Sequence, residues 1–168
     1  MLDDVTFMKA ALKEAQEAFQ AGEVPIGAVL VDAEGTVIAR AHNMRETWHD
    51  GTAHAEIIAL QEAARKLGRW RLSGLTLYVT IEPCPMCAGA LVMSRVDRVV
   101  YGATDAKAGA CESLFNIVRH PALNHQLKMR AGVLEDECRA IMKRFFGQRR
   151  KKSSALKKCT NQAFDAPE

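Results

Sequence analysis

The sequence has no long apolar run, no internal repeat and no stretch that resembles a linker. No segment approaches the ~20 consecutive apolar residues of a membrane-crossing helix, so we expect no association with a membrane. The chain starts with Met1, Leu2, Asp3 and Asp4 and lacks the basic and apolar regions of a secretory signal peptide. From these absences we expect a cytoplasmic protein.

Cysteine is scarce, and its number is odd, with Cys84, Cys87, Cys111, Cys138 and Cys159. In a reducing compartment, an odd count with one close pair indicates metal binding or catalysis before it indicates disulfides. The 168 residues suit one domain, and a domain of that size can bury a stable core without covalent cross-links.

Charge is unevenly distributed along the chain. Residues 1–138 have a balance of −4, whereas residues 139–168 have a balance of +7. The basic residues of this last part are Arg139, Lys143, Arg144, Arg149, Arg150, Lys151, Lys152, Lys157 and Lys158. Such a stripe can bind phosphate groups, and it can equally be a solvated tail that aids solubility.

Apolar periodicity predicts an alternation of helices and strands. We expect helices over 5–19, 54–67, 83–95 and 135–147, with a helical turn at 113–118. Strands are expected over 26–31, 36–41, 75–81, 96–101 and 127–134, and polar loops over 42–53 and 102–112. An initial hairpin followed by alternating elements indicates an α/β protein with a layered sheet of mixed direction. We expect one domain over 1–150 and a basic, flexible tail over 151–168.

Two short segments carry the chemistry, His54-Ala55-Glu56 and Pro83-Cys84-Pro85-Met86-Cys87, and each lies where a loop enters a helix. Cys84 and Cys87 are three residues apart, so one helical turn points both sulfur atoms the same way. The N-terminus of a helix favours anions and therefore the thiolate form that binds metal. With His54 as a third ligand, the nitrogen and sulfur donors suit zinc and leave one coordination position for water.

Glu56 is too close to His54 in the sequence to share the metal easily, but it is well placed beside a bound water. Histidine-x-glutamate together with proline-cysteine-x-x-cysteine is the known signature of zinc deaminases. Two alternatives remain open from the residues alone. The cysteine pair could be a redox pair, or it could belong to a structural zinc site completed by Cys111, Cys138 or Cys159.

At these residues the chain resembles the cytidine deaminase-like superfamily, and more closely the bacterial tRNA adenosine deaminases of the TadA type. The likeness covers roughly residues 5–150. Its most extended segments are 23–31, 41–43, 53–56, 76–90, 94–96, 102–107, 124–125 and 145–146. The resemblance implies a three-layer α/β/α cytidine deaminase-like fold with a central mixed five-stranded sheet.

The resemblance also implies roles for individual residues. His54, Cys84 and Cys87 would bind one zinc ion per subunit, and Glu56 would be the catalytic proton shuttle. Substrate contacts would come from Asn43, the backbone of Ala55, Asp105, Phe145, Phe146, Arg149 and Arg150. The family is homodimeric, so a homodimer is expected here.

The implied reaction converts adenosine to inosine at the wobble position (34) of the tRNA anticodon, with the anticodon stem-loop as partner. Zinc lowers the pKa of its water, Glu56 moves protons, and hydrolysis needs no organic cofactor. The alternative is the same chemistry on a free base or nucleotide, namely guanine, cytosine or deoxycytidylate, against which the basic tail argues. A non-enzymatic RNA-binding module with structural zinc is the rival from another class, and it would have no need for Glu56.

Overall fold

The computed structural model describes residues 1–164, with side chains described to residue 157. A mixed five-stranded sheet with strand order β2-β1-β3-β4-β5 forms the centre of the molecule. Its strands are β1 (Gly27–Val31), β2 (Val37–His42), β3 (Thr76–Ile81), β4 (Arg98–Ala103) and β5 (Lys128–Arg130). β1 is antiparallel to both β2 and β3, whereas β3, β4 and β5 run parallel.

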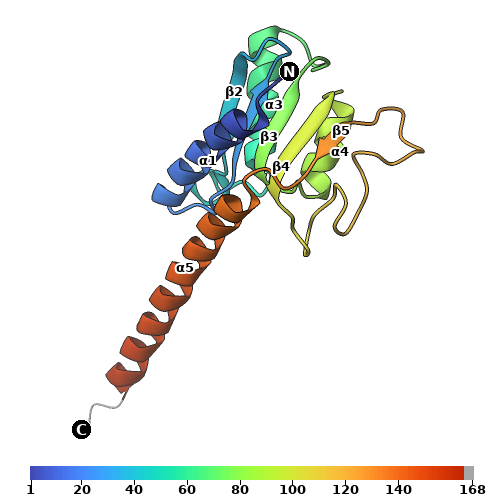
Figure 1. Ribbon diagram of the computed structural model, residues 1–168. Coiled ribbons are helices and arrows are strands. Elements are labelled where there is room, and N and C mark those ends of the chain that lie inside the picture. The colour runs from blue at the N-terminus through green and yellow to red at the C-terminus, as the bar shows by residue number, and fades with distance from the viewer. Residues whose placement is uncertain (165–168) are drawn as a thin grey trace.

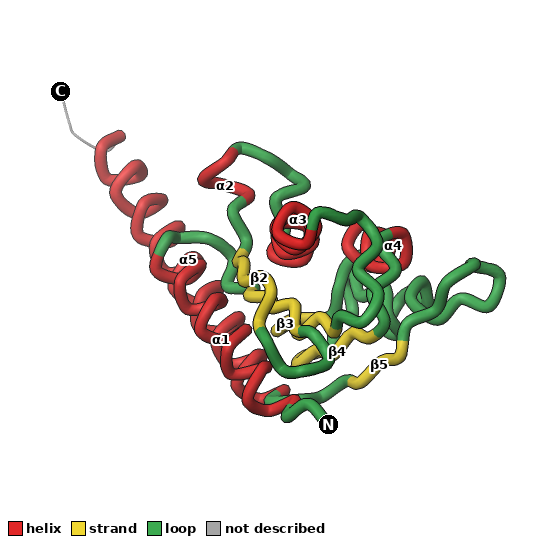
Figure 2. The backbone as a smooth tube through the Cα atoms, turned by 90° about the horizontal axis from the view of Figure 1, so that it is seen from above, coloured by secondary structure: helices red, strands yellow, loops and turns green. Residues whose placement is uncertain are grey.

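Helices cover both faces of this sheet (Figure 1, Figure 2). α1 (Asp4–Gln20) and the start of α5 (Glu135–Phe164) lie on one face. α3 (Ala55–Leu67) and α4 (Pro85–Met93) lie on the other, and a short α2 (Arg45–Trp48) precedes α3. The expected α/β fold of three layers is therefore confirmed, and a hydrophobic core lies on each side of the sheet.

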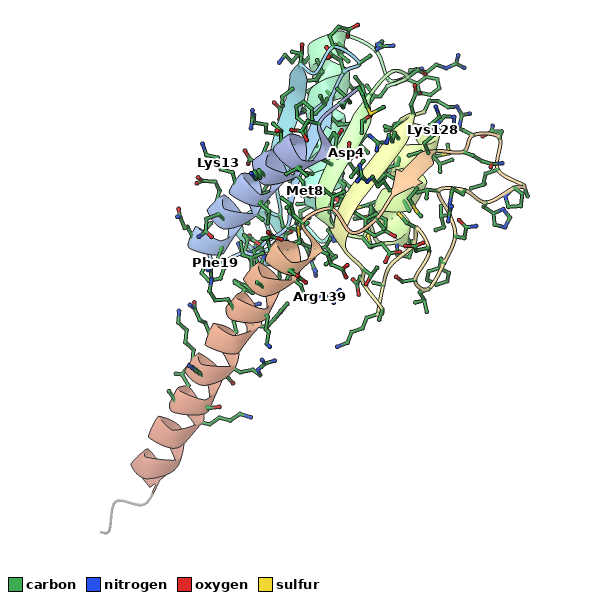
Figure 3. All side chains as sticks on the ribbon, viewed as in Figure 1. Asp4, Met8, Lys13, Phe19, Lys128 and Arg139 are labelled. Carbon is green, nitrogen blue, oxygen red and sulfur yellow. The ribbon has the colours of Figure 1, made fainter. Side chains whose placement is uncertain are left out.

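α1 packs closely on the sheet because small side chains line its inner face. Met8, Ala11, Ala15 and Ala18 are fully buried there, and Figure 3 shows Met8 between the helix and the strands. A Cβ atom at Gly27 of β1 would overlap the backbone at Ala11 and Ala15. Only glycine allows this close approach of strand and helix.

Apart from the last helix, the remaining expected elements agree with the structure to within a few residues, with three exceptions. α2 lies in a segment that we expected to be an irregular loop. The helical turn expected at 113–118 is absent, and turns and irregular backbone replace it. The strand expected over 127–134 is reduced to β5, of three residues.

The last helix is longer than the sequence pattern predicted. We expected it to end at residue 147, but α5 continues to Phe164 and projects beyond the sheet (Figure 1). Apolar periodicity ends near Phe146. The lysine, arginine, glutamine and alanine residues that follow have high helix propensity, so the helix continues although it has no apolar face there. Residues 165–168 of the predicted tail lie outside the described residues. No described helix has the length and apolar character required to cross a membrane.

Candidate active site

The expected metal ligands lie where two helices begin at the same edge of the sheet. His54 is the N-cap residue of α3 and Cys84 is the N-cap residue of α4, and both have extended backbone. Neither side chain caps its own helix. Both are free to turn toward the space between the two helices, and Pro85 starts α4 at a position where no N–H is required.

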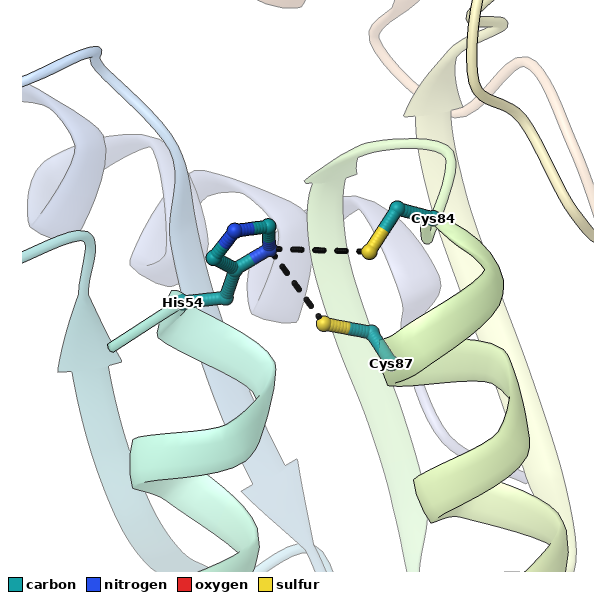
Figure 4. Close-up of side chains that lie close together, drawn as sticks. All are labelled: His54, Cys84 and Cys87. Carbon is teal, nitrogen blue, oxygen red and sulfur yellow. Dashed lines mark hydrogen bonds between the residues drawn. The ribbon is translucent and has the colours of Figure 1, made fainter. Parts of the chain in front are cut away.

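His54, Cys84 and Cys87 converge on one point (Figure 4). The Nδ1 atom of His54 lies 3.6 Å from Sγ of Cys84 and 3.5 Å from Sγ of Cys87. All three donor atoms lie within 4.8 Å of one another, and Cys87 is buried while the other two residues are partly buried. One nitrogen and two sulfur donors at this spacing are typical of zinc sites that leave a coordination position open.

The two thiols are unequal as acids. The hydrogen bond from Cys87 lowers the pKa of Cys84 to about 4, against the opposing effect of burial, and His54 contributes in the same direction. Donating that hydrogen bond raises the pKa of Cys87. Cys84 is thus the first of the pair to become a thiolate, the form that binds metal.

Glu56 lies in the first turn of α3, beside this cluster. Its side chain is 4% exposed, and Oε2 has no hydrogen-bond partner. Burial raises the pKa of this carboxyl group. A buried carboxylate oxygen without a hydrogen-bond partner destabilises the fold unless a bound group supplies the missing hydrogen bond. Glu56 therefore suits a site that holds water or substrate beside a metal.

A pocket of about 270 Å³, counting the space at its mouth, opens directly beside the cluster and is named the base pocket below. Its lining residues are Val24, Ile26, Asn43, Arg45, His54, Ala55 and Glu56. Asn43 is 3% exposed, and its Nδ2 donates to the Val24 carbonyl oxygen at 3.3 Å. Its Oδ1 accepts from the Arg45 N–H, also at 3.3 Å. These contacts hold the amide in one orientation at the pocket wall.

The other expected substrate residues lie outside the base pocket. Asp105 and Phe146 line a second pocket of about 710 Å³, counting the open space at its mouth, together with Lys107 and Arg139. Phe145 and Arg149 line a third pocket between α1 and α5. Arg150 is exposed farther along α5. The structure thus brings Asn43, Ala55, Glu56 and the three metal-binding side chains together, and distributes the rest over a surface that leads away from them.

The spare cysteines take no part in the cluster. Among the side chains that the structure describes, the metal-binding group contains His54, Cys84 and Cys87, and it does not include Cys111 or Cys138. Cys111 and Cys138 are buried and free, and burial raises the pKa of the Cys138 thiol to about 12. The side chain of Cys159 lies outside the described ones. A structural site completed by Cys111 or Cys138 therefore does not fit this arrangement.

Two buried carboxylates beside the pockets were missed by the sequence analysis. Glu23 is fully buried, and its Oε1 accepts from the Thr47 N–H at 2.6 Å and from the Thr47 hydroxyl at 2.9 Å. Glu82 follows β3 and accepts hydrogen bonds from the loop that contains Asp105. The sequence did contain a signal for both residues, because each glutamate lies within or next to an apolar segment. A charge in such a segment needs a specific partner.

Comparison with known proteins places the chain among deaminases. Residues 2–150 match the MafB19-like deaminase family. The tRNA-specific adenosine deaminase of Bacillus subtilis (strain 168) is 53% identical over 158 residues, which cover 94% of this chain and 98% of that protein. A structure from studies of A-to-I editing by tRNA:A34 deaminases at the wobble position has 46% identity and a TM-score of 0.78, covering 81% of this chain and 98% of that one.

A more distant likeness connects the chain with deaminases of free bases. The guanine deaminase structure from Bacillus subtilis has 36% identity and a TM-score of 0.59, and the match covers 76% of this chain and 83% of that one. Both the identity and the TM-score are lower than for the tRNA:A34 deaminase structure.

Proposed function

Because the chain belongs to the tRNA-specific adenosine deaminases of the MafB19-like deaminase family, we infer that it hydrolyses adenosine to inosine at the wobble position, 34, of a tRNA anticodon. The observation that carries this proposal is the position of the His54, Cys84 and Cys87 cluster. It lies beside a buried glutamate and a pocket lined by Asn43 and Ala55. A zinc deaminase that acts on one extruded base requires this combination.

The residues of the cluster fit zinc in number, type and burial. Zinc bound there would supply Lewis-acid activation of the water that attacks the base. The unpartnered Oε2 atom of Glu56 fits this assignment, because a proton acceptor must stand next to the attacking water.

In the proposed reaction Glu56 moves protons between three atoms. Its Oε2 takes a proton from the attacking water and passes it to N1 of adenine while the C6–O bond forms. The carboxyl group then carries the second proton from that oxygen to the exocyclic nitrogen, the C6–N bond breaks, and ammonia leaves. Glu56 ends as the carboxylate with which it started, so the cycle is closed.

Asn43 and Ala55 orient the extruded base in this proposal. The Asn43 amide is held by Val24 and the Arg45 N–H, and a free lone pair on its Oδ1 and the second Nδ2 proton can still meet polar atoms of the nucleotide. Ala55 contributes a backbone group at the start of α3. The buried pocket walls exclude bulk water from the reacting carbon.

The anticodon stem-loop meets a longer surface in the same proposal. Asp105 and Phe146 in the second pocket face a nucleotide that flanks the extruded base. Arg149 and Arg150 contact the backbone of the stem. Phe145 is 6% exposed, and its ring lies under the Arg149 guanidinium, so it supports this surface from inside. Residues 1–150 form the deaminase domain, and the basic residues from 151 onward add phosphate contacts that raise affinity without reading sequence. The cytoplasm, where tRNA is used, is the place of action.

We also propose a homodimer formed through the outer face of α3 and α4. Trp70 and Met93 are 58% and 70% exposed there, next to a shallow groove lined by Ile57, Leu60 and Ala64. Clustered apolar side chains of this size are typical of interaction surfaces. Light scattering should give twice the mass of the chain, and Trp70→Glu should shift the mass toward one chain.

The decisive experiment is sequencing of inosine in tRNA after incubation with the purified, zinc-loaded protein. Parallel reactions with free adenosine, guanine, cytosine and deoxycytidylate test the rival activity. Inosine at position 34 with no turnover of the small substrates supports the proposal. Turnover of guanine or a cytosine compound in place of tRNA would overturn it.

A further inference from the structure

Glu82 is a buried carboxylate that the reaction described above does not use. It follows the last residue of β3, precedes Pro83, and is 3% exposed. Five hydrogen bonds converge on it, and all five donors come from one irregular segment, residues 104–113, named the 104–113 loop below.

The two carboxylate oxygens together bind both ends of this loop. Oε2 accepts from the N–H of Asp105 at 3.0 Å and from the hydroxyl of Ser113. Oε1 accepts from the N–H groups of Cys111 at 3.1 Å, Glu112 at 2.9 Å and Ser113 at 2.9 Å. One side chain thus takes the place of the strand or helix that would otherwise satisfy these amides.

This arrangement requires a carboxylate in particular. An ionised carboxylate offers only acceptors, with about four lone-pair positions, so it can accept from all five donors if two of them share one position. The amide of glutamine would turn an NH₂ group toward some of these N–H groups and leave buried donors unsatisfied.

Gly109 shows how closely the loop wraps around the carboxylate. Its N–H donates to the Asp105 carbonyl oxygen at 2.8 Å. A Cβ atom added there would overlap the Glu82 carboxylate and lie 2.5 Å from the same Asp105 oxygen. The loop therefore has no room for a side chain at this point, and its shape depends on contact with Glu82.

The 104–113 loop connects the metal-binding cluster with the second pocket. The N–H of Ala110 donates to the carbonyl oxygen of Pro83, directly before Cys84, at 2.8 Å. At its other end the loop presents Asp105 and Lys107 to the second pocket, opposite Arg139 and Phe146 of α5. The position of these two charged side chains is thus set by the Glu82 carboxylate.

We propose that Glu82 is a positioning residue for the RNA substrate, because its carboxylate holds the 104–113 loop so that Asp105 and Lys107 form one wall of a flanking-nucleotide site. This inference rests on the proposed function, since the occupant of that site is the nucleotide next to the deaminated adenosine. Glu82 acts on the KM for RNA, through the loop, and leaves proton transfer at Glu56 untouched.

Glu82→Gln tests the proposal in the zinc-loaded protein with an anticodon stem-loop as substrate. We expect KM to rise at least tenfold, kcat to stay within threefold, and zinc content to stay the same. Amide hydrogen exchange should increase in residues 105–113 alone. Gly109→Ala leaves the carboxylate in place but displaces the loop, and it should reproduce the rise in KM.

Glu112→Gln is the matched control, since it makes the same chemical change within the 104–113 loop itself. The Glu112 carboxylate accepts from the Tyr101 hydroxyl at 2.6 Å, and a glutamine retains an oxygen for that bond. Its KM should stay within twofold of the original. An unchanged KM in Glu82→Gln would overturn the proposal, as would loss of zinc or faster exchange throughout the core, which indicates a purely structural role.

Failure of the proposed function gives a different pattern. A wild-type protein that leaves the stem-loop unedited refutes that function by itself. Hydrogen exchange in Glu82→Gln then still decides whether this carboxylate orders the 104–113 loop, and unchanged exchange there refutes the positioning role as well.

Discussion

Arg98 holds the carboxylate of Asp4 with two parallel hydrogen bonds, Nη1 to Oδ1 and Nη2 to Oδ2, each 2.8 Å long. The Tyr78 hydroxyl donates to Oδ1 at 2.8 Å, and Arg130 Nη1 donates to Oδ2 at 2.6 Å. Asp4 begins α1, and its partners lie on β3, β4 and β5 (Figure 3). One buried carboxylate thus fastens the first helix to the parallel half of the sheet.

Asp4→Asn should destabilise the fold by about 1–3 kcal/mol, because its buried amide cannot accept all the hydrogen bonds of the carboxylate and the half-buried Arg98 loses its counter-charge. Urea unfolding at pH 7 measures the change. Glu34→Gln, an exposed carboxylate in the β1–β2 turn, is the control and should leave the unfolding midpoint unchanged. An Asp4→Asn midpoint equal to that of the wild type would contradict the role of the network.

The same network predicts a pH dependence. Burial raises the pKa of Asp4, but the hydrogen bonds from Arg98, Tyr78 and Arg130 outweigh it and lower the pKa to about 2, from 3.8. Because the pKa is lower in the folded state than in the unfolded state, the ionised carboxylate stabilises the fold fully above the unfolded-state pKa. This stabilisation is lost as the pH falls toward the folded-state pKa. The stability gap between wild type and Asp4→Asn should shrink by about 1 kcal/mol from pH 7 to pH 3. A difference in stability that does not change with pH would refute this prediction. Effects of acid on the metal site are the same in both proteins and therefore cancel in the comparison.

Cys87→Ala should remove most of the zinc, which we expect at about one ion per chain, because two remaining ligands cannot close the site. Elemental analysis after dialysis against a weak chelator gives the metal content. Cys138→Ala makes the same change at a buried cysteine outside the cluster and should retain the full content. Full zinc in a well-folded Cys87→Ala protein would remove Cys87 from the ligand set.

Glu56→Gln should lower the rate of inosine formation by about two to four orders of magnitude while zinc and RNA binding persist. The substitution keeps the shape of the side chain and removes the group that accepts the proton. Glu62→Gln, on an exposed turn of the same helix α3, should retain normal turnover. Turnover of Glu56→Gln near that of the control would exclude Glu56 as the proton shuttle.

Truncation after Gly147 should weaken tRNA binding and flatten its salt dependence, since it removes Arg149, Arg150, Lys151 and Lys152 among other cations. We expect the slope of log affinity against log salt to fall in magnitude by about 2–4, with zinc content unchanged. Deamination should therefore decline mainly at subsaturating tRNA. Replacing Lys9 and Lys13 of α1 by glutamine is the control. Superimposable salt curves for full and truncated proteins would identify the tail as a solubility element.

Gly27→Ala should destabilise the fold by about 1–3 kcal/mol, because the added methyl group meets the backbone of α1. Gly51→Ala is the matched control, since a Cβ atom at Gly51 has no neighbour within 4 Å. Thermal unfolding of the two variants should separate them clearly. Equal midpoints would show that α1 can move away from β1 without cost.

The sequence predicted the elements whose pattern is repeated and apolar. β1 is an uninterrupted apolar run, β3 is rich in apolar and β-branched residues, and α3 combines a helical apolar face with Gly68 at its end. The metal-binding cluster was also predictable, because its residues are chemically specific and closely spaced. Local pattern and spacing are sufficient to predict those parts of the structure that depend on residues close together in the sequence.

The missed features depend on partners distant in sequence. The helical turn expected at 113–118 did not form, because the Ile117 N–H, which would close it on residue 113, donates to the Ala110 carbonyl oxygen in the loop that Glu82 holds. α2 has four residues and no capping side chain, so it left no periodic signal. Its position depends on Glu23, which lies 24 residues before Thr47. Long-range contacts of this kind have no counterpart in a local pattern.

The metal-binding side chains come from two helices whose starting residues stand 30 positions apart in the chain. An unfolded chain holds no such preformed set of ligands, so zinc binds the native protein far better than the unfolded one. By mass action, each tenfold excess of free zinc over its dissociation constant adds about 1.4 kcal/mol to stability. The zinc concentration therefore affects the fraction of unfolded protein that proteases can degrade. At low zinc we expect a lower amount of the protein as well as a lower activity per molecule.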